Sequence, residues 1–369
     1  MVDAFETSPD SDTRIVDGAR RRGRGTRSNA SSRFDREVRS EEDDGWGVLD
    51  DLPAFKTTVE IDASRTIIAT NQSPDISFDQ SINPYRGCEH GCVYCYARPT
   101  HCYLGLSAGL DFESKLFAKP NAAELLEKEL AKPGYKPKVI ALGANTDPYQ
   151  PIERTWTITR QVLQVLAKAK HPVGIVTKSG LVTRDIDILA PMARDGLVKV
   201  ALSVTTLDRS IARKMEPRAS TPQKRLEAIK TLSEAGIPTS VMVAPIIPAL
   251  NDSEIEAIMA AARDAGASEA GYVLLRLPLE IKDLFAEWLA TEFPDRASRV
   301  MSILRSMRGG KDYDARWFER QKGKGPYADQ IAQRFRLALR RLGLNERKYR
   351  LRSDLFVRPV VMGGQLALF

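Results

Sequence analysis

Three cysteines lie close together in the segment NPYRGCEHGCVYCYARPTH, at positions 88, 92 and 95. Their C-x3-C-x2-C spacing places three thiolates on one short loop, where they can ligate three corners of an iron-sulfur cube. The fourth iron then has no protein ligand and can bind a reactant. Gly87 and Gly91 relieve the steric restriction on a loop that must wrap so tightly. We therefore predict that Cys88, Cys92 and Cys95 hold a four-iron four-sulfur cluster.

Other interpretations of the cysteines stay open because the chain has a fourth, Cys102. All four could form a zinc site, although the six-residue gap before Cys102 does not match the paired spacing of zinc knuckles. The thiols could also be buried and inert. Cys102 itself could be a ligand, a hydrogen donor, or a residue without a chemical role, and we expect the last. A lone histidine is usually a structural donor, so His90 and His101 are left out of the metal set.

The elements that must position this loop are indicated by residues 77–293, where short apolar runs alternate with helix-like stretches. Continuous apolar runs are typical of parallel strands that helices cover on both faces. With an irregular strand before Cys88, the chain predicts a partial (β/α)6 barrel whose chemistry lies at the carboxyl ends of the strands. The predicted strands are 138–143, 173–177, 198–204, 239–246 and 271–277, and the predicted helices are 157–170, 184–194, 222–235 and 252–265.

The regions outside the barrel differ from it in composition. Residues 1–45 are polar, with five arginines between Arg20 and Arg27, and we expect a disordered tail followed by a lead-in segment at 46–76. We also expect a basic helical extension at 294–355 and an extended tail at 356–369. Within 299–352 there are 16 Lys or Arg against 5 Asp or Glu. DNA or RNA is therefore a candidate partner, with a solvated surface as the alternative.

The composition also bounds the compartment. No window approaches the roughly 18 unbroken apolar residues of a membrane span, so we expect no membrane partner. Four cysteines are too few for a disulfide framework in 369 residues, and the acidic start lacks the apolar run of a secretory signal. We expect a cytoplasmic protein.

The cysteine loop in this βα context resembles that of the radical S-adenosylmethionine (radical SAM) superfamily, in its spore photoproduct lyase-like branch. The resemblance covers most of 77–293. It implies that the open iron chelates S-adenosylmethionine, and that one electron, from a donor such as flavodoxin or ferredoxin, cleaves it to a 5'-deoxyadenosyl radical. It further implies hydrogen-atom abstraction from a nucleic acid or DNA-associated substrate, as in a repair lyase. The alternatives are a radical enzyme that modifies a protein or small molecule, and a non-catalytic iron-sulfur or zinc module.

The resemblance also implies roles for residues at the strand ends. Asn145, Thr146 and Asp147 would contact the methionine amino group, although Asp147 would equally suit an Asx turn. Lys178 would neutralise the methionine carboxylate. Ser203 would contact the ribose or methionine, or else be a core hydroxyl.

A further set of residues flanks the expected site. Glu216 and Arg218 resemble a family loop near the cofactor or substrate, although an ion pair holding that loop would explain them as well. Tyr94 and Tyr96 match tyrosines implicated in returning a hydrogen atom, although Tyr94 would also suit the adenine and Tyr96 could simply pack around the cluster. Arg276 would bind an anionic substrate group or brace an acid.

Two features bear on the substrate. The lyases carry a hydrogen-donating cysteine in the turn where Ala144 and Asn145 stand here, which argues against spore photoproduct repair itself. Residues 365–369, from Gln365 to Phe369, resemble the QLxLF peptide by which DNA-repair and replication proteins dock on the sliding clamp. The clamp is therefore a second expected partner, and packing of these apolar residues on the barrel is the alternative.

Overall fold

The computed structural model describes residues 15–35 and 53–360, and its centre is a seven-stranded sheet in the order β10-β9-β8-β7-β6-β3-β2. Neighbouring strands from β3 to β10 pair in parallel, and β2 is antiparallel to β3 at one edge. The strands are β2 (Ile68–Thr70), β3 (Gln80–Ile82), β6 (Ile140–Leu142), β7 (Val173–Thr177), β8 (Val198–Ser203), β9 (Thr239–Ile246) and β10 (Glu269–Leu274). Six parallel strands confirm the predicted partial (β/α)6 barrel.

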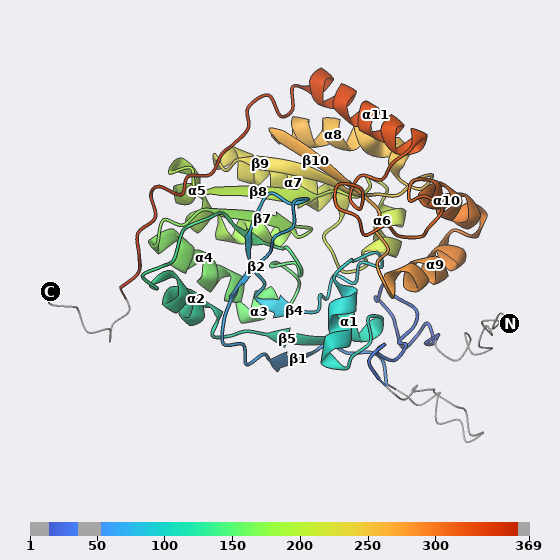
Figure 1. Cartoon of the computed structure of the whole chain (residues 1–369), viewed down its shortest axis with the longest axis horizontal. Coiled ribbons are helices and arrows are strands. Elements are labelled where there is room, and N and C mark those ends of the chain that lie inside the picture. Colours follow the sequence, from blue (N-terminus) through green and yellow to red (C-terminus); the bar gives the residue numbers. More distant parts are fainter. Residues whose placement is uncertain (1–14, 36–52, 361–369) are drawn as a thin grey trace.

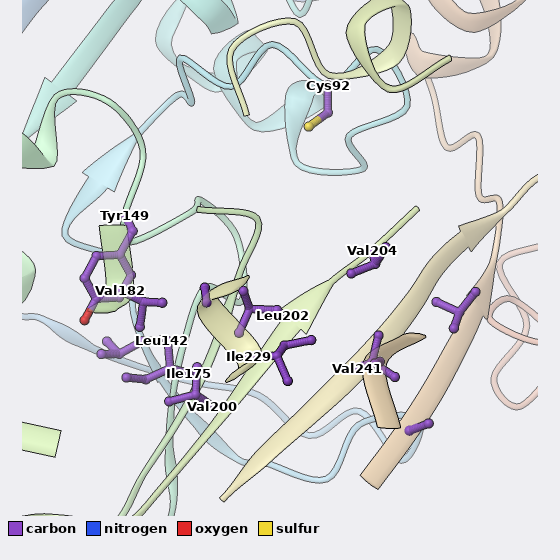
Figure 2. Packing of buried hydrophobic residues seen from close by; sticks show 14 of the residues in the cluster. Cys92, Leu142, Tyr149, Ile175, Val182, Val200, Leu202, Val204, Ile229 and Val241 are labelled. Atoms are coloured by element: carbon purple, nitrogen blue, oxygen red, sulfur yellow. The ribbon is translucent and has the colours of Figure 1, made fainter. Parts of the chain in front are cut away.

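Amphipathic helices cover the outer face of this sheet (Figure 1). They are α2 (Ala122–Leu130), α4 (Ile158–Lys168), α5 (Ile186–Arg194), α7 (Pro222–Glu234) and α8 (Ile255–Asp264). Shorter helices connect them, namely α3 (Glu153–Trp156), η3 (Gly180–Asp185), α6 (Arg209–Met215) and η4 (Asp252–Glu254). The strands' apolar side chains are buried between the layers, among them Leu142, Ile175 and Val200 (Figure 2). This burial explains why the strands read as continuous apolar runs.

A second, three-stranded sheet that the sequence did not predict lies beside the barrel, in the order β1-β5-β4. Its strands are β1 (Thr58–Ile61), β4 (Tyr85–Arg86) and β5 (Lys115–Ala118). The cysteine loop leaves β4 and leads into η2 (Arg98–Leu104) and α1 (Leu110–Ser114). The backbone N–H of Cys88 donates to the carbonyl of Phe112 at 3.0 Å, so this small subdomain supports the loop from behind.

Residues 15–35, which belong to the N-terminal segment expected to be a disordered tail, lie within the described ranges, and we call them the strap. It packs beside α1 (Figure 1), and Arg24, Thr26 and Ser28 are buried. The reason is a buried carboxylate rather than apolar contact, because Glu113 accepts hydrogen bonds from the backbone N–H groups of Gly25 and Thr26. Composition alone could not indicate a partner of this kind. The other residues of 1–45 lie outside the described ranges.

The helical C-terminal extension is confirmed. Its helices are α10 (Pro294–Ser306) and α11 (Pro326–Leu342), and α9 (Ile281–Glu292) directly precedes it. Two of its arginines have acidic partners that are distant in the sequence, in the pairs Arg320 with Asp75 and Arg334 with Glu256. The count of 16 basic against 5 acidic residues therefore overstates the charge that is free to meet a partner.

The chain then crosses the barrel at the amino ends of its strands (Figure 1). The N–H of Arg352 donates to Gly196 at 3.0 Å, and the N–H of Val357 donates to Ala169 at 2.8 Å. Residues 356–360 form no helix or strand, and 361–369, including the clamp-like peptide, lie outside the described ranges. Within those ranges, no helix is long and apolar enough to cross a membrane.

Candidate active site

The cysteine loop covers the carboxyl ends of the strands. The N–H of Val93 donates to the carbonyl of Met215, at the end of α6, at 3.1 Å. Cys88 and Cys92 are buried and Cys95 is half-buried. Figure 2 shows Cys92 projecting from the loop toward the strands. Gly91 has φ of +67°, a left-handed conformation that the loop needs and that glycine adopts without strain.

The donor set of this loop fits an iron-sulfur cluster. Burial raises the pKa of Cys88 well above its usual value and that of Cys92 to about 12. Thiols so placed stay protonated unless a metal replaces the proton, as it does in thiolate ligation. Among the described residues no three His, Cys, Asp or Glu side chains form a ready-made metal site. The assignment therefore rests on the three thiols, their spacing and the loop's conformation.

A buried ion pair supports the cysteine loop. Arg98 donates from Nε to the carbonyl of Cys92 at 2.8 Å and from its other end to Glu113 at 2.6 Å. Both side chains are completely buried, and Glu113 also holds the strap through Gly25 and Thr26. Sequence reasoning missed this pair, and its one signal was that Arg98 lies three residues after Cys95.

Asp147 lies beneath the loop but is already fully engaged. It accepts hydrogen bonds from Thr177 Oγ1 at 2.6 Å and from the N–H groups of Lys178 and Tyr149, and it pairs with His90 at 3.3 Å. Burial alone would raise its pKa, but His90 and these donors outweigh burial and lower the pKa to about 2. The geometry favours the Asx-turn interpretation of Asp147 over direct contact with an ammonium group.

The neighbouring turn residues point to the same conclusion. Thr146 is buried and donates from its hydroxyl to the carbonyl of Tyr85 at 3.0 Å. The N–H of Asn145 donates to the side chain of Asn83 at 3.0 Å. Within the described ranges, the side-chain amide of Asn145 makes no hydrogen bond that holds this turn. Asn83, which sequence reasoning missed, fixes the turn.

Lys178 extends from the end of β7 toward the cysteine loop, with Nζ 5.7 Å from the centre of the Tyr94 ring. Burial would lower its pKa, but the nearby Cys92 and Glu216 outweigh burial and raise it. Across the described ranges, no acidic group lies within ion-pair distance of Nζ. Lys178 is thus a charged group that is available to an anion. Ser203 is buried at the end of β8, and its carbonyl accepts from Arg225 at 2.9 Å.

Glu216 and Tyr94 belong to one buried network. Glu216 accepts from the hydroxyls of Tyr94 and Thr205 and from the guanidinium of Arg225. Burial acts to raise the pKa of Glu216, but Arg225 and Lys178 lower it to about 2. The hydroxyl of Tyr94 is therefore committed to a carboxylate inside the protein. Sequence reasoning missed Arg225, which lies near the start of α7.

The other two flanking residues are more accessible. Tyr96 is 45% exposed and donates to the carbonyl of Ala144, and the guanidinium of Arg276 lies 4.8 Å from the centre of its ring. Arg218 pairs with Glu89 on the cysteine loop and donates to the carbonyl of Gly23 in the strap at 3.1 Å. This is the loop-holding ion pair that we gave as the alternative for Arg218, although its partner is Glu89 rather than Glu216.

Cys102 lies apart from this site. It is buried with Ala108 and Leu284, whereas Cys88 and Cys95 pack with Ala97 and Phe112. His101 places Nε2 2.8 Å from the carbonyl of Lys115. The structure therefore gives neither residue a place among the three cysteines.

Comparison with known proteins identifies the family. The Radical SAM superfamily pattern matches residues 82–262, which contain the cysteine loop and the strands from β4 to β9. An uncharacterized protein of Mycobacterium tuberculosis is 36% identical over 242 residues, which are 64% of this chain and 71% of that protein. The chain belongs to the radical SAM superfamily. As a radical SAM enzyme, it uses a four-iron four-sulfur cluster and S-adenosylmethionine.

Solved structures agree with this fold. A spore photoproduct lyase variant with bound AdoMet and dinucleoside spore photoproduct superposes with a TM-score of 0.55 at 15% identity, over 77% of this chain and 78% of that one. The radical SAM barrel is thus shared at a sequence distance that indicates fold alone. An uncharacterized protein of Methanocaldococcus jannaschii is 32% identical over 173 residues, which are 47% of this chain and 62% of that protein.

Proposed function

We propose that this radical SAM enzyme begins hydrogen-atom abstraction on a nucleic acid. The observation that carries the proposal is Arg276, at the mouth of the barrel. It has no ion-pair partner among the described residues, and its Nε is buried without a hydrogen-bond partner. A guanidinium held in this way beside a half-exposed tyrosine suits a phosphodiester. The fold is shared with a spore photoproduct lyase variant that holds a dinucleoside spore photoproduct, which supports the same substrate class.

The residues at the mouth have separable tasks under this proposal. When bound, the cluster and S-adenosylmethionine supply a 5'-deoxyadenosyl radical. Cys88, Cys92 and Cys95 would hold the cluster, and the charged Lys178 would hold the methionine carboxylate. Asn145 and Ser203 are the nearest candidates for further polar contacts with the cofactor. Asp147 and Thr146 would act indirectly, by fixing the turn that carries Asn145.

The proposed reaction differs from photoproduct repair in how hydrogen is returned. All four cysteines of the chain are accounted for, because three lie on the loop and Cys102 is buried elsewhere. The turn at Ala144 therefore offers a backbone carbonyl bonded to Tyr96, and no thiol. Tyr96 is the accessible phenol at this position, so we assign it the hydrogen-transfer role. Tyr94, whose hydroxyl is buried on Glu216, would act as a wall of the cofactor site.

The test measures 5'-deoxyadenosine from anaerobically reconstituted, chemically reduced protein with S-adenosylmethionine. Single-stranded DNA, duplex DNA, RNA and a peptide mixture are added separately, and the triple Cys88→Ala, Cys92→Ala, Cys95→Ala variant is the control. We expect one nucleic acid to raise the yield above the uncoupled background. Stimulation by peptides alone would instead support a protein-modifying enzyme.

A further inference from the structure

The loop between α10 and α11 presents two adjacent aromatic rings to solvent. Trp317 is 58% exposed and Phe318 is 69% exposed. Single apolar residues on a surface are common, but two neighbouring aromatic rings left in water usually mark a contact surface. We call residues 311–324 the platform loop.

The platform loop is held firmly in the conformation that exposes these rings. Arg308, which is only 1% exposed, donates to the carbonyls of Glu319 at 2.6 Å and Leu275 at 2.9 Å. The N–H of Phe318 donates to Asp75 at 2.6 Å, and Phe318 has φ of +66°, which is unfavourable for an aromatic residue. Such a conformation persists only when surrounding contacts enforce it. The exposure is therefore a fixed property of the loop.

The platform loop also lies at the catalytic end of the barrel. The N–H of Leu274, the last residue of β10, donates to the carbonyl of Gln321 at 2.8 Å. Figure 1 shows the connection between α10 and α11 beside the arrowhead of β10. Arg276, two residues further on, faces Tyr96 from the cysteine loop. The exposed rings and the site thus share one end of the molecule.

The charge around the rings is positive. Lys311 and Lys322 are exposed, and no ion pair involving either occurs within the described ranges. Arg316, by contrast, is neutralised by Asp314 and Glu319. Exposed aromatic rings flanked by free lysines suit a nucleic-acid strand, because bases stack on rings and phosphates meet the cations.

We propose that Trp317 and Phe318 stack against unpaired bases of a nucleic-acid strand whose phosphates lie against Lys311 and Lys322. The loop would hold the strand across the mouth of the barrel, with Arg276 next along its path. This inference rests on the proposed function and deepens it, since it names a single-stranded or locally unpaired substrate.

The test separates stacking from charge. Fluorescence anisotropy with labelled single-stranded and duplex oligonucleotides is measured over a range of salt concentrations. Trp317→Ala and Phe318→Ala should weaken single-strand binding about 5- to 150-fold each and leave the salt slope unchanged. The double variant Lys311→Ala, Lys322→Ala should reduce the slope of log affinity against log salt concentration by roughly 1.4, the value for two phosphate contacts of a single strand.

Tyr349→Ala is the matched control. Tyr349 is an exposed aromatic of the same basic extension, but its N–H bonds Glu269, where β10 begins at the far end of the barrel. It should bind as the unchanged protein does, and every variant should keep its circular dichroism and iron content. Equal loss from Tyr349→Ala, or none from Trp317→Ala and Phe318→Ala, would overturn the proposal.

The two proposals fail in distinguishable ways. If oligonucleotide binding depends on the platform loop but no nucleic acid raises the yield of 5'-deoxyadenosine, the proposed function is contradicted, and the platform loop is still supported as a binding surface. If a nucleic acid still raises the yield of 5'-deoxyadenosine after both rings are removed, the proposed function is supported and the platform inference is contradicted. If the protein without substitutions binds no oligonucleotide at low salt, the platform inference is overturned. If a purified protein displaces the oligonucleotide from the loop, the loop is instead a protein contact.

Discussion

Each cysteine of the loop is predicted to hold one iron. Replacing Cys88, Cys92 or Cys95 by Ala should abolish the brown chromophore and the paramagnetic signal of the reduced cluster, because two thiolates cannot hold a cube with an open iron. Cys102→Ala is the matched control, since its thiol is equally buried but packs with Ala108 and Leu284. Loss of the cluster in that variant would contradict the three-cysteine assignment.

Gly25 is predicted to be essential to the strap. A Cβ there would lie 1.8 Å from the carbonyl oxygen of Gly91, so Gly25→Ala must push the strap off the cysteine loop. Each buried hydrogen bond to Glu113 that is lost should cost about 1–3 kcal/mol of unfolding free energy. Iron loss to a chelator should accelerate.

Gly18→Ala serves as the control for the strap, because the nearest heavy atom to its Cβ would be 3.9 Å away. It should keep its iron as the unchanged protein does. If Gly25→Ala also retains iron normally, the strap does not support the cluster loop.

Substitutions of Lys178 and Asp147 are predicted to change different properties, namely cofactor affinity and stability. Lys178→Met keeps the apolar stem and removes the charge, so S-adenosylmethionine affinity should fall about 10- to 100-fold with iron content intact. Asp147→Asn weakens a carboxylate that four groups hold, so it should lower stability without changing affinity in the folded protein. Isothermal titration and thermal unfolding separate the two outcomes, and an affinity loss confined to Asp147→Asn would reverse these roles.

Among the elements, the C-terminal tail depends on a neutral histidine. Tyr135 and His171 pack around Phe356, each with ring centres 5.6 Å from it. Burial lowers the pKa of His171 from 6.5 to about 4. In the unfolded chain, His171 binds a proton below about pH 6.5, whereas in the folded chain it does so only below about pH 4. The free energy of unfolding must therefore fall as the pH drops through that window.

The expected loss from His171 is ~3 kcal/mol between neutral pH and pH 4. Denaturant unfolding at a series of pH values measures it. His171→Asn does not titrate there, so its stability should be lower at neutral pH but should change less with pH. A parallel pH dependence in both proteins would remove His171 as the cause.

The elements that sequence could predict are those whose stability comes from apolar periodicity. Strands β7 and β9 match the predicted bounds, because side chains that recur along each strand are buried in the core. The strap escaped prediction because polar groups hold it. Glu113 accepts buried hydrogen bonds from backbone N–H groups of the strap, which lies more than eighty positions away in the sequence. A local sequence pattern does not indicate a contact at that separation.

The same reasoning explains the site. The cysteines carry their own signal in their spacing, whereas Asp147, Thr146 and Glu216 looked like ligands because strand ends collect polar residues. Their hydrogen-bond partners Asn83 and Thr177 come from other βα units, and Arg225 comes from the helix that follows Glu216. A one-dimensional pattern therefore places these residues at the mouth but cannot tell contact from support.

At the scale of the whole molecule, residues 365–369 remain predicted to bind the sliding clamp. Tail contacts as far as Arg358, which donates to Lys132, precede this peptide, so its deletion should leave the fold unchanged. Burial of Leu368 and Phe369 in a groove could contribute about 3–6 kcal/mol before ordering costs, which suits a micromolar tether. Surface plasmon resonance with immobilised clamp should lose its signal on deletion, and an unaltered signal would exclude the peptide as the tether.

The barrel is closed by segments that its recognisable repeat does not include. Asp75 bonds Arg320 and Phe318, so a loop before β3 meets the loop after α10 across the open side of the sheet, while the strap covers the cysteine loop. A recombinant protein trimmed to 82–262 would lack β10, expose the edge of β9, and leave Glu113 without its strap donors. Such an edge is a template for strand pairing between copies. We expect the trimmed protein to form inclusion bodies, whereas the chain from residue 15 to 360 should purify as a folded protein that accepts iron.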